Sequence, residues 1–188
     1  MVLLDAYYDY VLKNTECPVT FHRWSIISAV AASLGRNFYL PFGHGVVYPN
    51  MMIKLIGQPA TRKSSAIGIV KELLEQSGYL NIIQGGTSRE KFLEDLSNNF
   101  SYLRDNTEED GGELLDLFEG DSCLDSMKIC EAFIAAGEFT NFMGQGNSSF
   151  ASYLGDLYDN PSTYPIRLKN GKSLMIQNPI INILGGNT

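Results

Sequence analysis

The segment LIGQPATRKSSAIGIV, residues 55–70, constrains the fold more than any other part of the sequence. An apolar stretch ends at Gly57, a short polar loop follows, and Lys63-Ser64-Ser65 opens a pattern typical of a helix. A strand, a tight turn and a helix N-terminus in this order predict a phosphate-binding loop, because backbone N–H groups and the helix dipole attract an anion. Lys63 would reach the terminal phosphates, and the Ser64 hydroxyl would bind Mg²⁺.

This loop departs from the pattern G-x-x-x-x-G-K-[ST] at one position, because Arg62 stands where the second glycine is usual. An arginine leaves the phosphates accessible if its side chain points outward, although its backbone then adopts a conformation that glycine adopts more easily. Pro59 would stiffen the loop in compensation. The alternative is an ordinary turn between strand and helix with a lysine cap. The predicted nucleotide-binding residues are Gly57, Gln58, Pro59, Ala60, Thr61, Arg62, Lys63, Ser64 and Ser65.

Apolar segments that alternate with helical patterns along the chain predict an α/β fold with a mainly parallel sheet. The expected strands cover residues 51–57, 78–83, 127–139 and 180–186, and the expected helices cover residues 3–14, 21–35, 63–77, 88–99 and 148–158. Thr20 is expected to cap the second helix, and Thr87 or Ser88 the fourth. Two short strands are expected around Gly43-His44-Gly45. We divide the chain into an N-terminal helical segment, 1–36, and a core, 37–188.

Polar residues follow two of the predicted buried strands. Glu138 comes at the end of strand 127–139, after Gly137, and Asn187 follows strand 180–186. Ligands of open α/β sheets bind at the carboxyl ends of the strands, so both side chains are candidates for the same site as Lys63. Glu138 would orient an attacking water and, together with Ser64, bind the magnesium ion. Asn187 would hold the γ-phosphate and the water. A solvent-facing carboxylate and a simple strand-ending turn are the respective alternatives.

A hairpin is predicted over residues 164–177, because Asn170-Gly171 separates two alternating segments. Arg167, Lys169 and Lys172 concentrate positive charge around its tip, and Lys169 and Lys172 are expected to flank a two-residue turn. Like charges across a hairpin cost stability, which is reasonable if nucleic-acid phosphates lie opposite them. The alternative is a solvated tip, which lysines often decorate.

Composition narrows the remaining classes of function. The formal net charge of −7 argues against a broad nucleic-acid or anionic-membrane surface and leaves room for a small basic patch within a cleft or ring. Three scattered cysteines and two histidines fit neither a disulfide framework nor a zinc site, so a reducing, cytoplasmic compartment is expected. The acidic stretch 104–126 is read as an exposed insertion. The N-terminus does not read as a signal peptide, and no apolar run is long enough to span a membrane.

Three segments together carry a resemblance to a known family: YPNMMIKLIGQPATRKSSAI, AAGEFTNFMG and YLGDLYDNPSTYPIRLKNGKSLMIQNPIINILGGNT. They resemble the ATPase domain of phage and plasmid primase-helicase proteins, which is related to the AAA+ and superfamily-three helicases, and the resemblance covers residues 20–188. It implies a P-loop NTPase core that binds ATP and Mg²⁺ and works on DNA, usually as a ring. Lys63 and Ser64 would be the Walker A pair, Glu138 the Walker B acid and Asn187 the sensor-1 residue.

The resemblance also implies that the hairpin projects into the pore of a ring and contacts single-stranded DNA. Because the sequence stops after a predicted buried strand, we expect it to be a fragment of a longer protein. The expected function is a motor that hydrolyses ATP in phage or plasmid replication. Arg62 and Gly137 favour the alternative, a nucleotide-binding or DNA-loading module without hydrolysis of its own. A small-molecule kinase is a third interpretation, and the lack of an arginine-rich lid counts against it.

Overall fold

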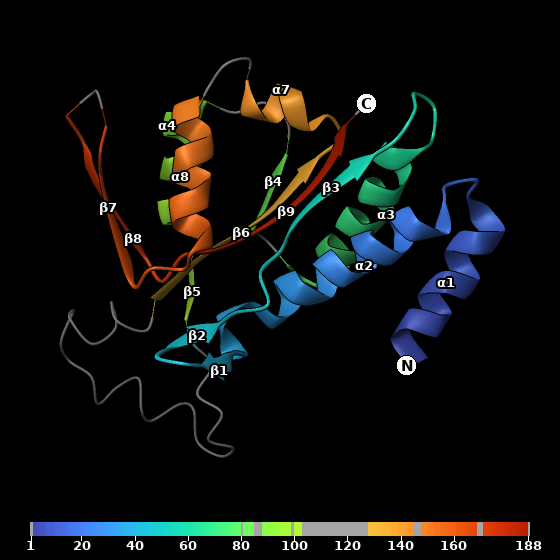
Figure 1. Cartoon of the computed structure of the whole chain (residues 1–188), viewed down its shortest axis with the longest axis horizontal. Coiled ribbons are helices and arrows are strands. Elements are labelled where there is room, and N and C mark those ends of the chain that lie inside the picture. Colours follow the sequence, from blue (N-terminus) through green and yellow to red (C-terminus); the bar gives the residue numbers. More distant parts are fainter. Residues whose placement is uncertain are drawn as a thin grey trace.

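Figure 1 shows a computed structural model of the chain, which describes residues 2–79, 81–84, 88–98, 100–102, 128–144, 148–168 and 171–187. The helices are α1 (Val2–Asn14), α2 (Val19–Leu34), α3 (Lys63–Gln76), α4 (Arg89–Asn98), α7 (Phe139–Met143) and α8 (Ser148–Tyr158), and a 3₁₀ turn, η1, spans Gly35–Asn37. The strands are β1 (Leu40–Phe42), β2 (Gly45–Val47), β3 (Met52–Ile56), β4 (Ile82–Gln84), β5 (Phe100–Tyr102), β6 (Lys128–Ala136), β7 (Thr163–Arg167), β8 (Ser173–Gln177) and β9 (Ile180–Asn187).

A parallel sheet with the strand order β3-β9-β6-β4 forms the centre of the molecule. The last strand of the described chain, β9, lies between β3 and β6, which are far apart in sequence (Figure 1). The short β5 pairs antiparallel with the first residues of β6. The predicted α/β fold with a mainly parallel sheet is therefore confirmed.

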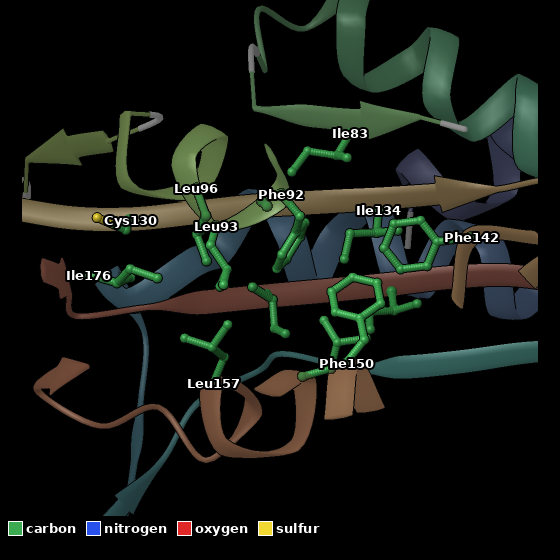
Figure 2. Close-up of a cluster of buried hydrophobic side chains, with 14 of the residues drawn as sticks. Ile83, Phe92, Leu93, Leu96, Cys130, Ile134, Phe142, Phe150, Leu157 and Ile176 are labelled. Carbon is green, nitrogen blue, oxygen red and sulfur yellow. The ribbon is translucent and has the colours of Figure 1, made fainter. Parts of the chain in front are cut away.

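Both faces of the central strands β6 and β9 are buried, which explains why these strands are mostly apolar rather than alternating. Side chains that alternate along β6 and β9 enter two different clusters: Ile134 and Ile183 on one face, Phe133 and Leu184 on the other. The first face is covered by α4, α8 and the β7–β8 hairpin (Figure 2). The second face is covered by α1, α2 and α3, so the N-terminal helices share a core with the sheet.

Three aromatic rings fix α7 to the end of β6. Phe142 of α7 packs against both Phe92 of α4 and Phe150 of α8, with ring centroids 6.3 and 5.4 Å away, and those two rings are 5.4 Å from each other, so the three rings contact one another (Figure 2). Phe139, also on α7, packs against the same cluster. The segment that carries Glu138 is thus held by burial on the sheet rather than left as a free loop.

Several predicted boundaries are corrected by the structure. Strand β6 ends at Ala136 instead of continuing to residue 139, because Gly137 and Glu138 turn the chain into α7, and strand β4 begins at Ile82 instead of residue 78. Helix α2 begins at Val19, and the Pro18 carbonyl accepts the N–H of Phe21, so the expected Thr20 cap is wrong. The Ser88 cap is confirmed by its hydroxyl, which accepts the N–H of Lys91 at 3.2 Å.

The predicted β7–β8 hairpin is present, but its turn is longer than expected. Arg167 pairs with Ser173, and the N–H of Leu168 donates to the carbonyl of Lys172 at 2.8 Å, which leaves the three positions 169–171 between them. Gly171 has φ +83°, as in three-residue hairpin loops that end in a left-handed residue. The expectation that Lys169 faces Lys172 across a two-residue turn is therefore wrong. Lys169 and Asn170 lie outside the described residues.

The end of β9 approaches the segment after β6 so closely that it requires glycine. A Cβ atom on Gly186 would lie 2.6 Å from the carbonyl oxygen of Gly137, and one on Gly185 would lie 2.8 Å from the ring of Phe139. Cβ atoms in proteins essentially never make contacts this short. The two glycines therefore let residues 137–139 pass directly over β9. They thereby set the position of Glu138 at the end of the sheet.

Replacement of Gly186 by alanine tests this close approach. We expect Gly186→Ala to lower the free energy of unfolding by about 1 to 3 kcal/mol, because the neighbouring group is backbone and cannot rotate away. Gly68→Ala is the matched control: Gly68 lies in α3 with open space around its Cα, so alanine should raise stability by about 0.5 to 1 kcal/mol. Urea unfolding of both variants measures the difference, and equal effects would contradict the role of Gly186.

Candidate functional site

The carboxyl ends of three parallel strands meet beside the N-terminus of α3. Ile56 of β3 is opposite Asn187 of β9, and the N–H of Gly57 donates to the Asn187 carbonyl at 3.4 Å. On the other side of β9, Ala136 is opposite Gly185, so the residues that follow β6 reach the level of Asn187. The fold therefore brings the 57–62 loop, Glu138 and Asn187 to one edge of the sheet, as expected for a parallel arrangement.

The 57–62 loop contains two non-glycine residues in the left-handed region. Ala60 has φ +67°, and Arg62 has φ +58° and ψ +27°. The loop is closed by the N–H of Thr61, which donates to the Gln58 carbonyl, and α3 begins with the N–H of Ser65, which donates to the Arg62 carbonyl at 3.0 Å. Tight turns of this kind can direct successive N–H groups to one side and so form an anion-binding concavity.

The ammonium group of Lys63 lies inside this loop. Its Nζ atom donates to the carbonyl oxygens of Gly57 at 2.8 Å and Gln58 at 2.9 Å, and it lies 3.3 Å from the hydroxyl oxygen of Thr61. The residue is 7% exposed, so these oxygens replace the water that a buried ammonium group needs. Lys63 thus connects the beginning and the end of the loop and places a positive charge between them.

The side chain of Arg62 points away from the loop, toward the connection between α1 and α2. Its Nη2 atom is 3.9 Å from a carboxylate oxygen of Glu16, and the two side chains are 62% and 88% exposed. An ion pair this exposed contributes little to stability. The arginine that replaces the usual glycine therefore does not cover the loop, and its effect is confined to the backbone conformation.

Ser64, the first residue after Lys63 in α3, faces the backbone that follows β6. A Cβ atom built on Gly137 would lie 3.7 Å from the Ser64 hydroxyl oxygen. A carboxylate at position 137 would thus be within reach of that hydroxyl, and glycine supplies none. Ser64 is itself exposed, so its hydroxyl is accessible to a ligand in front of α3.

Glu138 lies at the N-cap position of α7 and is held by a neighbour that the sequence analysis did not identify. The hydroxyl of Thr140 donates to Oε1 of Glu138 at 3.0 Å. The E-x-T spacing is the signal in the sequence, because a hydroxyl two residues after a carboxylate can reach it at a helix start. This contact orients one carboxylate oxygen of Glu138 at the start of α7.

The donors fit a magnesium ion better than a zinc ion. Ser64 and Glu138 offer a hydroxyl and a carboxylate oxygen, and Mg²⁺ is commonly bound by one or two such groups together with phosphate oxygens and water. Within the described ranges, no group of three or more His, Cys, Asp or Glu side chains is placed to hold a metal ion.

Burial raises the pKa of Cys17, whose thiol packs near α3 and therefore stays protonated.

The hairpin lies on the opposite face of the sheet from α3. Ile166, Leu168 and Ile176 are buried in the cluster that includes α4 and α8, whereas α3 packs on the other face. Arg167 is exposed, and Lys172 makes an ion pair with Glu94 of α4 at 3.3 Å. Part of the positive charge predicted at the tip is therefore compensated within the chain.

Comparison with models of known protein families, with curated proteins and with solved structures gives no match. In the part of the chain that the structure describes, none of the helices combines the length and the apolar character needed to cross a bilayer.

Replacement of Arg62 tests whether the loop is strained. A left-handed conformation costs a residue with a Cβ atom about 1 to 2 kcal/mol, and part of the gain from glycine is lost to the entropy of the unfolded chain. We therefore expect Arg62→Gly to raise the free energy of unfolding by about 0.5 to 1 kcal/mol, measured by urea unfolding. Arg62→Ala keeps the strain and removes the exposed ion pair, so its stability should stay within about 0.5 kcal/mol of the original chain. A gain from alanine equal to that from glycine would show that the side chain, not the backbone, is responsible.

Proposed function

We propose that this chain is a P-loop NTPase that binds a nucleoside triphosphate, with ATP as the expected substrate, through the 57–65 segment and hydrolyses it. The observation that carries the proposal is the position of the Lys63 ammonium group. It lies within a tight loop between a parallel strand and a helix N-terminus, and the ends of the two neighbouring strands lie beside it. This combination of backbone N–H groups, helix dipole and buried cation suits a polyphosphate.

Each residue of the site has a role in this proposal. The loop backbone and Lys63 bind the β- and γ-phosphates, and the ammonium group can exchange its longest contact, to Thr61, for a phosphate oxygen. Glu138, oriented by Thr140, accepts a hydrogen bond from the attacking water and directs it toward the γ-phosphate. Asn187 would hold the same water or the γ-phosphate. Ser64 and Glu138 would hold a magnesium ion, which would supply positive charge to neutralise the charge that develops on the phosphates.

The wider role that we propose is that of a motor domain of a phage or plasmid replication helicase or primase-helicase, assembled as a ring on single-stranded DNA. This part rests on the sequence resemblance. The exposed Arg167 near the hairpin tip supports it, as does the position of the hairpin in the chain immediately before β9. For Lys172 to contact DNA, its ion pair with Glu94 would have to open. If that ion pair stays closed, Arg167 and Lys169 would make the main contacts to DNA phosphates.

Two substitutions separate binding from hydrolysis. We expect Lys63→Ala to abolish detectable ATP binding, because the loop then loses both its central charge and its internal hydrogen bonds. Glu138→Gln should keep binding and lower turnover by about 100-fold or more, since an amide cannot accept the proton of water in the same way. Equilibrium binding of ATP and release of phosphate measure the two effects, and unchanged turnover in both variants would contradict the proposal.

The position of Gly137 favours a second candidate, a nucleotide-binding module that does not hydrolyse ATP by itself. Glycine there leaves the Ser64 hydroxyl without a neighbouring carboxylate from β6, at a distance where one would fit. A magnesium ion would then depend on Ser64, Glu138, phosphates and water alone.

Introduction of the missing carboxylate distinguishes the two candidates. Gly137 does not have a positive φ, so Gly137→Asp is compatible with the backbone. If the second candidate is right, the original chain binds ATP but releases phosphate no faster than ATP does without protein. Gly137→Asp should then release phosphate in a Mg²⁺-dependent reaction that is at least about tenfold faster than this background. Gly137→Asn, similar in size but uncharged, is the control and should gain much less. Robust turnover by the original chain would rule the second candidate out.

A further inference from the structure

The link between α1 and α2, together with the first residues of α2, packs behind the 57–62 loop. We call these residues, 15–21, the α1–α2 corner. The Phe21 ring lies 3.1 Å from the position that a Cβ atom on Gly57 would occupy, so it contacts the loop at its first residue. The buried Cys17 packs against Ala66 in the first turn of α3. The corner therefore supports both the beginning of the loop and the start of the helix that follows it.

A buried histidine holds this corner in place. His22 is 0% exposed, and both of its ring nitrogens lie within hydrogen-bond distance of a hydroxyl group. Nδ1 is 3.1 Å from the hydroxyl oxygen of Tyr7 on α1, and Nε2 is 2.7 Å from that of Thr15 in the corner. His22 thus connects α2 to α1 and to the link between them.

The hydrogen bonds define the protonation state of His22. The Thr15 hydroxyl donates its one proton to the Val11 carbonyl at 3.0 Å, so toward His22 it can only accept. Nε2 therefore carries a proton, and in the neutral ring Nδ1 accepts the proton of the Tyr7 hydroxyl. A second proton, on Nδ1, would meet that hydroxyl proton. The corner in this structure is held by the neutral imidazole.

The surroundings of His22 do not favour a positive charge. The titratable groups on the adjoining segments are Tyr7 and Tyr8 of α1 and Glu16 and Cys17 of the corner. Burial raises the pKa of Tyr7 and Cys17, so both stay neutral near pH 7, and the Glu16 side chain is 88% exposed to water. The elements that pack on α2 from the sheet side and from α3 contribute apolar residues to the core there: Leu55, Ala66, Ile67, Val70 and Leu184. Burial accordingly lowers the pKa of His22.

We propose that neutral His22 positions the 57–62 loop for anion binding, and that a second proton on His22 releases the α1–α2 corner and weakens that binding. This inference rests on the proposed function and adds to it a regulation by pH. A charged ring is poorly tolerated in a fully buried position without a carboxylate beside it. Protonation thus favours states in which the corner moves and the ring reaches water, and Phe21 and Cys17 then no longer support the loop.

An NMR titration of the original chain without ligand tests this coupling. His22 and His44 are the two histidines of the sequence, and His44 is exposed in the turn between β1 and β2, so His44→Gln assigns the two imidazole signals. His22 should titrate below about pH 6.5, the value of an unperturbed histidine. The backbone amide signals of residues 57–65 should shift with the same midpoint. Amide signals that stay constant while His22 titrates, or that follow His44, would overturn the proposal.

The pH dependence of ATP affinity gives the functional test. His22→Gln cannot take up a proton, and its amide N–H can donate to Thr15 as Nε2 does. At pH 8 its affinity should be within about threefold of that of the original chain, but on going to about pH 5.5 the original chain should lose at least about fivefold more, because only its neutral form binds well. Phosphate groups also take up a proton near about pH 6, and the comparison between the two chains removes that contribution. His44→Gln is the matched control and should behave as the original chain.

The outcomes separate this inference from the function on which it rests. If the original chain and His22→Gln both bind ATP at pH 8 and lose affinity in parallel on acidification, the role of His22 is wrong and the proposed function stands. If neither binds ATP at pH 8, both proposals are wrong. Circular dichroism follows the fold at each pH, and unfolding of the whole chain together with protonation of His22 would also overturn the inference. If His22→Gln does not fold, the NMR titration of the original chain decides.

Discussion

The insertion of β9 between β3 and β6 is the constraint on which the rest of the structure depends. Because this late strand lies between two earlier ones, the carboxyl ends of three parallel strands meet at one edge of the sheet.

A buried arginine fixes the segment that leads into β9. Arg36 donates hydrogen bonds to the carbonyls of Asn160, Pro161 and Pro179 and to the side chain of Asn178, and its guanidinium group stacks on Tyr48. Burial lowers the Arg36 pKa, but arginine titrates so far above neutrality that the charge persists. Four acceptor groups compensate its desolvation, so β9 is anchored at its start by Arg36 and released from steric conflict at its end by Gly185 and Gly186.

The same balance of cost and compensation shapes the 57–62 loop. Two left-handed residues, Ala60 and Arg62, cost about 1 to 2 kcal/mol each. The hydrogen bonds of the Lys63 ammonium group to two carbonyls contribute about 1.5 to 3 kcal/mol each when a charged donor is involved. The cost of the two left-handed conformations and the gain from the two hydrogen bonds are similar in size. The loop can therefore keep its shape before any ligand binds. A preformed loop loses less conformational entropy on binding than one that must be ordered by the phosphates.

The parts of the fold that follow from local patterns could be predicted from the sequence, and those that depend on tertiary neighbours could not. The parallel sheet and the helix after Lys63 are recognisable from apolar periodicity and from strand–loop–helix order. Strand β6 ends earlier than the apolar pattern predicts, because Phe139 continues that pattern but packs over Gly185 as part of α7. The loop of the hairpin is longer than Asn170-Gly171 predicts, because this dipeptide is compatible with two loop lengths and the pairing of Leu168 with Lys172 selects the longer.

The site contains more of what binding requires than of what hydrolysis requires. In the proposed function, a phosphate group would be bound by a buried ammonium group, by N–H groups of the loop and by the N-terminus of a helix of 14 residues. The proposed hydrolysis would depend on a single carboxylate, that of Glu138, which accepts a hydrogen bond from one hydroxyl and has glycine at the preceding position. Loss of one group on the hydrolytic side would leave no substitute, whereas the binding side has several. The physical basis for the proposed nucleotide binding is therefore stronger than that for the proposed turnover. If the proposed ring on DNA forms, hydrolysis is the property that it would increase most, by supplying charge that the described residues of one chain do not.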